Sequence, residues 1–203
     1  MILDDFPRLA LPNLTGDLTT DVGALLKANG KARTYRHVLD VVQANAEIAA
    51  QYNLDATACR TAALLHDIAA IIPPADMLSW ADAHGLDTCE AERRHPFLLH
   101  QRFSRMIATD RFGAADDIVL SAIECHTTLR EEAGPCEMAL FIADKLAWDQ
   151  EGAPPFFDAV SAALKRSLPA ACLVYMNYMT DNGLLLCPHV SWTAAQRWLK
   201  NSI

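Results

Sequence analysis

The sequence has little glycine, few aromatic residues and no long uninterrupted apolar run. Its 203 residues include 8 glycines, and Phe, Trp and Tyr together make up 7%. Stretches in which apolar and polar residues alternate are nearly absent, which argues against a β-sheet protein. No apolar run approaches the roughly 20 residues that a membrane span needs, and the N-terminus lacks the basic start and apolar stretch of a secretory signal. We therefore expect a soluble, cytoplasmic protein with no membrane partner.

Cysteine pairs at metal-binding spacing and an excess of basic residues are also missing. The 6 cysteines are scattered without a CxxC pair, so we expect small buried apolar residues rather than a disulfide or zinc framework. Lys and Arg number 17 against 25 Asp and Glu, for a net charge of −8. This charge opposes loose attachment to a nucleic-acid backbone, so nucleic acid is not an expected partner. The oligomeric state stays open, with a dimer among the alternatives.

The residues that are present predict an all-α protein. Apolar residues make up 52% and charged residues 21%, as in a compact globular domain, and the length favours one domain. Asp17 is placed to cap a first helix that ends before Gly30. Helical periodicity and Gly or Pro stops predict helices over residues 17–29, 34–52, 55–70, 74–84, 96–112, 115–128, 136–149, 155–181 with a break at Pro169, and 193–201.

Polar residues interrupt the apolar faces of several of these helices. Residues three, four and seven apart share a helical face, and by this spacing six side chains point inward or reach the interior from a helix edge: His37, His66, Asp67, His100, His126 and Asp144. One inward histidine is usually a hydrogen-bonded core residue, but unpaired buried carboxylates would each cost several kcal/mol. A metal centre removes that cost, and imidazoles with carboxylates and no thiolate suit iron, manganese, cobalt, nickel or zinc.

The order of these residues and the segments around them resemble the HD-domain metal-dependent phosphohydrolases. The segments are YRHVLDVV (35–42), ALLHDIA (63–69), PFLLHQ (96–101), AIECHTT (122–128) and FIADKL (141–146). Within that superfamily they are most similar to the YqeK-like branch, the symmetrical diadenosine tetraphosphate hydrolases. The resemblance covers about residues 31–150, with a weaker match at PHVSWT (188–193). It implies a single helical-bundle domain with a metal centre in its core, flanked by helical extensions at 1–30 and 155–203.

The resemblance also implies roles for individual residues. The six inward residues would bind two metal ions, with iron expected and Asp67 as the bridge. Two such ions can activate water and clamp phosphoryl oxygens during in-line attack. His66, Asp67 and Lys145 are therefore candidate catalytic residues. Arg130 matches an arginine of the family, Lys145 lies beside Asp144, Thr127 can orient a ligand or cap a helix end, and His189 lies near a family His-Pro segment. These four are candidate substrate-binding residues.

Three departures from the family pattern lie on the substrate side. Ala70 stands where many relatives have lysine, Gln101 where glycine is usual, and Gln150 where an arginine is expected. The favoured reaction is hydrolysis of diadenosine tetraphosphate to two ADP. The departures keep two alternatives open, namely a phosphohydrolase for another nucleotide and a non-catalytic, metal-binding regulatory module.

Overall fold

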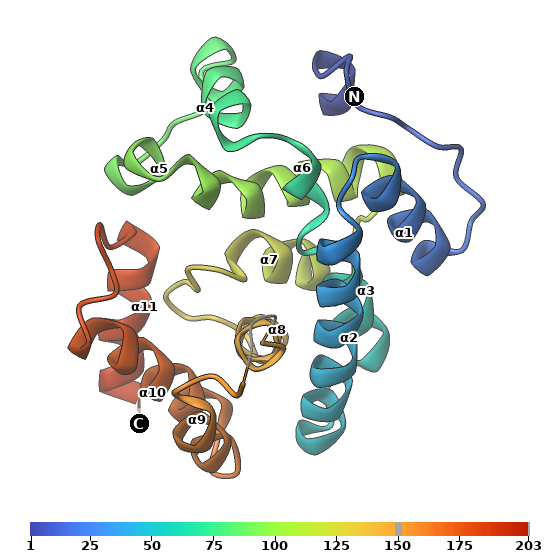
Figure 1. Cartoon of the computed structure of the whole chain (residues 1–203). Helices are drawn as coiled ribbons and strands as arrows, with labels where there is room; N and C mark the ends of the chain where they lie inside the picture. The colour runs from blue at the N-terminus through green and yellow to red at the C-terminus, as the bar shows by residue number, and fades with distance from the viewer. Residues whose placement is uncertain (149–151, 203) are drawn as a thin grey trace.

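A computed structural model describes residues 1–148 and 152–202, and over these ranges the chain is helical and contains no strand (Figure 1). The α-helices are α1 Leu18–Ala28, α2 Ala32–Tyr52, α3 Ala56–Leu65, α4 Pro74–Ala83, α5 Glu90–Arg94, α6 His100–Phe112, α7 Asp117–Cys125, α8 Pro135–Leu146, α9 Phe157–Leu164, α10 Leu168–Asp181 and α11 Val190–Ser202. Short 3₁₀-helices span η1 Ile2–Asp5, η2 Ile68–Ile71 and η3 Pro96–Leu99. The all-α fold class is confirmed. Gln150 lies outside the described residues.

Helix α8 is the centre of the fold. It packs against α2, α3, α7 and α10, and Figure 1 shows it nearly end-on among them. Its six consecutive residues 138–143 are all buried, because a helix that is apolar around its whole circumference belongs inside. Pro135 occupies the first turn, where its missing N–H costs nothing. Asp144 directly follows the buried stretch, so α8 carries a carboxylate into the interior.

Two predicted helices end earlier than expected and are each followed by a histidine, and the helix predicted over 136–149 also ends early, at Leu146. The helix predicted over 55–70 ends at Leu65 and is followed by η2, and the one predicted over 115–128 ends at Cys125. The ring nitrogens Nδ1 of His66 and His126 contact the carbonyl oxygens three residues earlier, both at 2.8 Å. These carbonyls are ones that a continuing helix would use. The imidazoles therefore help to end both helices.

The remaining differences concern short elements and helix ends. The predicted helix over 155–181 is broken before Leu168, not at Pro169, because Ser167 caps α10 by accepting the Ala170 N–H (3.2 Å) and proline fits the first turn. Helix α11 begins at Val190, three residues before the predicted start. The elements η1 and α5 were not predicted, because four or five residues are too few to show a helical period. At Asp17 the prediction is confirmed, since its side chain accepts the Thr20 N–H at 2.8 Å.

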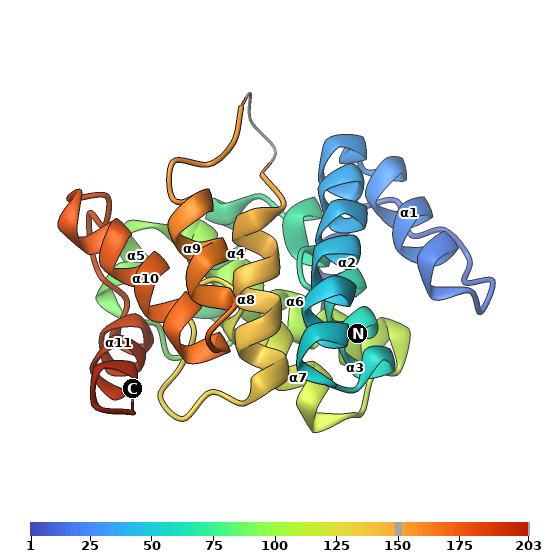
Figure 2. The same cartoon turned by 90° about the horizontal axis from the view of Figure 1, so that it is seen from below.

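The chain ends lie on opposite sides of the molecule (Figures 1 and 2). Helix α1 packs on α2 and α3, while α10 joins α9 and α11 to α8. We propose that this packing makes one domain of a central part, residues 31–150, and extensions 1–30 and 155–203.

Among the described residues, no single helix is long and apolar enough to cross a membrane, although the bent pair of residues 56–71 and 74–83, angled at 89°, would pass on length and composition.

Candidate metal centre and its cavities

The six inward residues meet at one place in the interior, although five separate helical segments supply them. His37 lies in α2, His66 and Asp67 follow α3, His100 begins α6, His126 follows α7, and Asp144 lies near the end of α8. Their imidazole Nε2 atoms and carboxylate oxygens face one another at 2.9–4.0 Å. The structure thus brings together the whole predicted ligand set.

Asp67 lies between two pairs of histidines. Its Oδ2 is 3.6 Å from Nε2 of His66 and 4.0 Å from Nε2 of His37. Its Oδ1 is 3.2 Å from Nε2 of His100 and 3.6 Å from Nε2 of His126. Each carboxylate oxygen therefore faces a different pair, and the site divides into two groups that share Asp67 and could each hold a metal ion.

Asp144 completes the group that contains His37 and His66. Its Oδ1 lies 2.9 Å from Nε2 of His37 and 3.6 Å from Nε2 of His66. Burial would raise the pKa of Asp144, but the Lys145 ammonium and the neighbouring imidazoles of His37 and His66 hold it well below its ordinary value. Burial would likewise raise the pKa of Asp67, which the neighbouring imidazoles of His66, His100 and His126 hold well below the usual range. Both carboxylates are therefore ionised at neutral pH.

The four histidines share one orientation. Each directs Nδ1 to a backbone carbonyl: His37 to Ala147 (3.2 Å), His66 to Ala63 (2.8 Å), His100 to Phe97 (2.6 Å) and His126 to Ile123 (2.8 Å). Because a carbonyl oxygen only accepts, these contacts place the proton of a neutral ring on Nδ1. The Nε2 lone pair then points to the centre, as in histidines that bind metals.

The donor atoms of the centre fit metal ions. Nε2 of His66 is buried and has no hydrogen-bond partner, which is costly unless a ligand satisfies it. The Nε2 atoms of His100 and His126 lie 2.9 Å apart, so two lone pairs oppose each other unless a cation or a proton lies between them. Burial lowers the pKa of His126 to about 4, which keeps this ring neutral. Nitrogen and carboxylate donors without thiolate suit the metals expected from the sequence.

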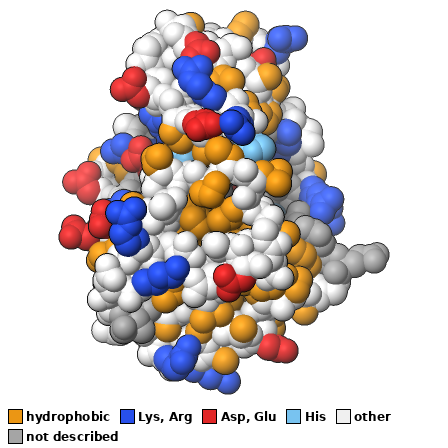
Figure 3. Space-filling view, turned by 90° about the vertical axis from the view of Figure 1, so that its left-hand side faces the viewer, with side chains coloured by type: hydrophobic (Ala, Val, Ile, Leu, Met, Phe, Trp, Pro, Cys, Tyr) orange, Lys and Arg blue, Asp and Glu red, His pale blue; other side chains and the backbone are white. Residues whose placement is uncertain are grey.

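Two mainly apolar cavities adjoin the centre. The loop cavity, about 340 Å³, is lined by Phe97, Thr127, Leu184–Cys187 and Trp192 among others. The aromatic cavity, about 390 Å³, is lined by His37, Asp144, Trp148, Phe156 and Tyr178 among others. Both cavities share Lys145, Tyr175, Met179 and Leu184. On the face drawn in Figure 3, histidine side chains lie at a hollow with hydrophobic side chains around it.

Lys145 lies where the two cavities meet. Its Nζ donates to the His126 carbonyl at 3.2 Å and pairs with Oδ2 of Asp144. Burial would lower the pKa of Lys145, but the Asp144 carboxylate outweighs it and raises the pKa. The side chain is therefore a fixed cation beside the centre, in reach of whatever fills either cavity.

Thr127 lies on the turn after α7, close to the centre. Its backbone N–H donates to Oε1 of Gln101 at 3.1 Å, and its hydroxyl lies 3.4 Å from Nε2 of His100. Gln101 is buried and also donates from Nε2 to the Thr128 hydroxyl at 3.1 Å. The glutamine that replaces the usual glycine therefore holds this turn in place.

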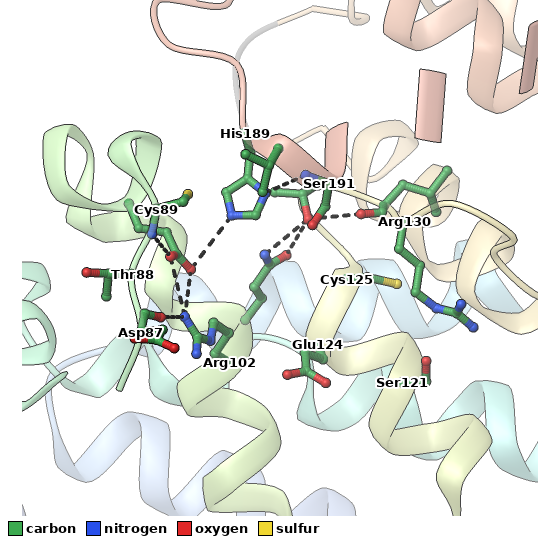
Figure 4. A pocket seen from close by; sticks show the side chains of 15 residues that line it. Asp87, Thr88, Cys89, Arg102, Ser121, Glu124, Cys125, Arg130, His189 and Ser191 are labelled. Carbon is green, nitrogen blue, oxygen red and sulfur yellow. Dashed lines mark hydrogen bonds and ion pairs between the residues drawn. The ribbon is translucent and has the colours of Figure 1, made fainter. Parts of the chain in front are cut away.

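Arg130 and His189 line a third, polar cavity of about 540 Å³ (Figure 4). The Arg130 guanidinium pairs with the buried Glu137 through Nε–Oε1 (2.6 Å) and Nη2–Oε2 (2.9 Å). Arg130 is not among the residues that line the loop or aromatic cavity. Its role in binding phosphate stays a prediction. His189 lines both the polar cavity and the loop cavity.

Sequence reasoning missed the residues that α10 and the following loop bring to the cavities. Tyr175, Met179 and Leu184 line both the loop cavity and the aromatic cavity. Apolar residues at helical spacing are usually core residues, so their place beside the centre carried no signal in the sequence.

Comparison with known proteins shows the family to which this chain is related. Residues 34–149, more than half of the chain, match the HD domain family. An uncharacterized protein in the pepC 5′ region of Lactococcus lactis subsp. cremoris is 34% identical over 142 residues, which cover 70% of this chain and 72% of that protein.

Two further similarities come from more distant proteins. A probable nicotinate-nucleotide adenylyltransferase/Ap4A hydrolase of Mycoplasma genitalium is 25% identical over 160 residues; the match covers 77% of this chain and 45% of that protein. A crystal structure of a predicted HD superfamily hydrolase involved in NAD metabolism from Clostridium acetobutylicum superposes with a TM-score of 0.80 at 26% identity, covering 95% of this chain and 100% of that one. By its sequence match and by its fold, the chain belongs to the HD domain family.

Proposed function

We propose that the protein is a metal-dependent phosphohydrolase of nucleotide polyphosphates, and that its reaction is the symmetrical hydrolysis of diadenosine tetraphosphate to two ADP. The observation that supports the substrate is the pair of mainly apolar cavities that meet at the Lys145 ammonium beside the centre. A dinucleoside polyphosphate has the matching layout, with an apolar ring system at each end and negative charge in the middle. Both cavities have volumes within the range of about 300–1,000 Å³ that ligand pockets usually show.

Two metal ions would be held by the two histidine groups on either side of Asp67. Iron is the metal proposed from the family resemblance, with manganese, cobalt, nickel and zinc as alternatives. Such a pair, when bound, activates water at neutral pH and neutralises phosphoryl oxygens. Asp67 would supply the carboxylate that both ions share, and the backbone contact of His66 keeps its Nε2 directed at the centre.

The chain itself supplies charge and hydrogen-bond donors for the phosphates. Lys145 stabilises the negative charge that grows on the phosphoryl group, because a preorganised cation in a buried site acts more strongly than one in water. Its contacts to Asp144 and to the His126 carbonyl hold the ammonium in place before substrate binds. The Thr127 hydroxyl, on the wall of the loop cavity, is placed to donate to a phosphate oxygen.

Two alternative functions can be compared with this proposal. Hydrolysis of another nucleotide would accommodate Ala70 and Gln101, and the clostridial relative is described as involved in NAD metabolism. A purely structural or regulatory metal site would be expected to be closed by its protein ligands. The aromatic cavity, which is lined by His37, Asp144 and Lys145, favours a site that receives a substrate.

Product analysis tests the reaction. Purified protein loaded with iron is incubated with diadenosine tetraphosphate, with NAD and with mononucleotides, and the nucleotides are separated by chromatography. We expect two ADP from diadenosine tetraphosphate as the fastest reaction. Formation of ATP and AMP would contradict symmetrical cleavage, and faster turnover of NAD or a mononucleotide would favour the alternative substrate.

The metal mechanism is tested with Asp67→Ala. This variant should lose activity, whereas Asp82→Ala, which removes an exposed carboxylate paired with Arg93, should keep it. Activity retained by Asp67→Ala would contradict the metal mechanism.

A further inference from the structure

The loop between α10 and α11, residues 183–189, forms a wall of the loop cavity but has little burial to hold it there. Leu184, Leu186 and Cys187 line the loop cavity, and Leu184 also lines the aromatic cavity. Leu184 is 50% exposed and Leu186 is 82% exposed. Apolar groups that remain this exposed contribute little to fixing a backbone, because the hydrophobic gain scales with the area removed from water. Leu185 packs partly buried against the core, and the Leu184 N–H donates to the Met179 carbonyl at 3.0 Å, so these contacts hold the start of the loop and its later residues depend on others.

His189, at the end of this loop, has both ring nitrogens engaged within the protein. Its Nδ1 accepts the backbone N–H of Ser191 at 3.1 Å. In a neutral ring the proton is then on Nε2, which faces Oε1 of Glu92 at 3.7 Å (Figure 4). The ring thus joins α11 and its preceding loop to α5, almost one hundred residues earlier in the chain.

Glu92 is a firm anchor for that contact. It is 2% exposed, accepts the Cys89 N–H at 2.9 Å, and lies 3.2 Å from Nη1 of Arg102. Arg102 in turn donates to the Asp87 carbonyl at 2.7 Å. Burial would raise the pKa of Glu92, but the nearby His189 imidazole, the hydrogen bond from Cys89 and the charge of Arg102 lower it to about 2. The anchor is therefore anionic and fixed on three sides.

A second metal site is the competing interpretation of the same cluster. Cys89, Glu92 and His189 lie close enough together to hold an ion. Two features oppose it: the Arg102 guanidinium already neutralises Glu92, and the Ser191 contact leaves the proton of His189 on the nitrogen that would bind the ion. The charges of the cluster are balanced without a metal.

We propose that His189 is a positioning residue, which fastens the loop 183–189 to Glu92 and so fixes the wall of the cavity that receives one nucleoside of the substrate. This inference rests on the proposed function of the centre for its substrate. His189 then acts on selectivity and not on the chemical step. A substrate with two nucleosides must fill the loop cavity and the aromatic cavity together, whereas one with a single nucleoside can use the aromatic cavity alone.

The test compares three variants for loop exposure and selectivity. His189→Ala removes the tie, His189→Gln keeps an N–H donor for Glu92, and His84→Ala is the control, since His84 is exposed and stacks on Trp80. Loop exposure is the rate at which iodoacetamide labels Cys187, resolved from the other cysteines by peptide mass spectrometry. Selectivity is the ratio of kcat/KM for diadenosine tetraphosphate to that for adenosine tetraphosphate.

We expect His189→Ala to label Cys187 several times faster and to lower the selectivity ratio by roughly tenfold, as the loss of one good contact would. The fall should come from KM for diadenosine tetraphosphate, with kcat within about twofold and metal content unchanged. His189→Gln should recover most of both effects, and His84→Ala should behave as wild type.

Two results would overturn the proposal. One is a His189→Ala protein in which neither the labelling of Cys187 nor the selectivity ratio changes. The other is an equal loss of kcat for both substrates at an unchanged labelling rate, which would place His189 on the reacting group. Should wild-type protein hydrolyse no dinucleoside polyphosphate, the proposed function would fail separately, and the labelling rate would still decide whether His189 fastens the loop.

Discussion

The Nε2 atoms of His100 and His126 lie 2.9 Å apart, while each ring already directs Nδ1 to a backbone carbonyl. Burial would lower the pKa of His100, but its hydrogen bond to Asp67 and the charge of that carboxylate raise it. The pKa of His126 is about 4. In the absence of metal, protonation of His100 relieves the repulsion between the two Nε2 lone pairs. A metal ion bound to both nitrogens would take the place of that proton.

Removal of metal should therefore lower thermal stability. An ion present at 100 times its Kd stabilises the folded state by about 2.7 kcal/mol per site, and a domain of this size changes its Tm by about 2–4 °C per kcal/mol. We expect chelation to lower Tm by roughly 5–10 °C per ion lost, measured by calorimetry before and after metal is restored. Asp67→Ala is the matched control, because chelation should barely change its Tm. Equal Tm values for wild type with and without chelator would contradict the prediction.

Lys145→Met should lower kcat by roughly 10²–10³-fold, the usual cost of removing one preorganised stabilising group. The substitution keeps much of the apolar stem but removes the cation that both cavities share. Lys145→Arg, which retains charge with a different shape, should lose less, and Lys27→Met, at an exposed position, should leave kcat unchanged. Steady-state kinetics with metal content measured in parallel checks this. A Lys145→Met enzyme with normal kcat would exclude Lys145 from the reaction.

Acid should remove the stability that Glu92 supplies. Its pKa falls from 4.5 to about 2 on folding, so the unfolded chain binds more protons and the contribution, about 3 kcal/mol, is complete above pH 4.5 and disappears as pH falls toward 2. Glu92→Gln should be less stable than wild type at pH 7, and the difference should shrink at pH 3. Urea unfolding of metal-free proteins at both pH values gives the comparison. A difference independent of pH would show that the carboxylate charge is not the cause.

Arg130→Ala should reduce stability more than catalysis. Its guanidinium pairs with Glu137, which is 3% exposed, and hydrogen bonds to charged groups contribute about 1.5–3 kcal/mol. Because Arg130 itself is half-exposed, we expect a loss of about 2 kcal/mol in the free energy of unfolding, measured by urea denaturation. A rise in KM at unchanged stability would instead establish the phosphate-binding role that the family resemblance implies.

The meeting of the six residues could be predicted from the sequence, because helical spacing places five of them on apolar stripes and Asp67 at a helix edge. His37, His66 and Asp144 all follow this pattern, and the segments around them resemble the family. Which oxygen of Asp67 faces which histidine pair could not be foreseen, since it depends on how α3 ends. That ending involves the contact between the His66 ring and the Ala63 carbonyl three residues earlier, a local side-chain-to-backbone contact that periodicity does not encode.

The substrate side was less predictable for a different reason. Tyr175 and Met179 have the spacing of ordinary core residues, and only the packing of α10 against α8 brings them to the cavities. His189 and Glu92 lie far apart in the sequence, and they are in contact because the loop before α11 lies beside α5. Cavity walls that are formed by residues far apart in the sequence leave no local sequence pattern.

The proposed mechanism depends on Asp67 being shared by two metal ions, which can be tested by counting and locating the ions. Elemental analysis of metal-replete protein, combined with anomalous diffraction at the absorption edge of the metal found, should show two ions per chain, one beside His37 and His66 and the other beside His100 and His126. Protein that contains no metal under these conditions, or a single ion that does not touch Asp67, would contradict the claim.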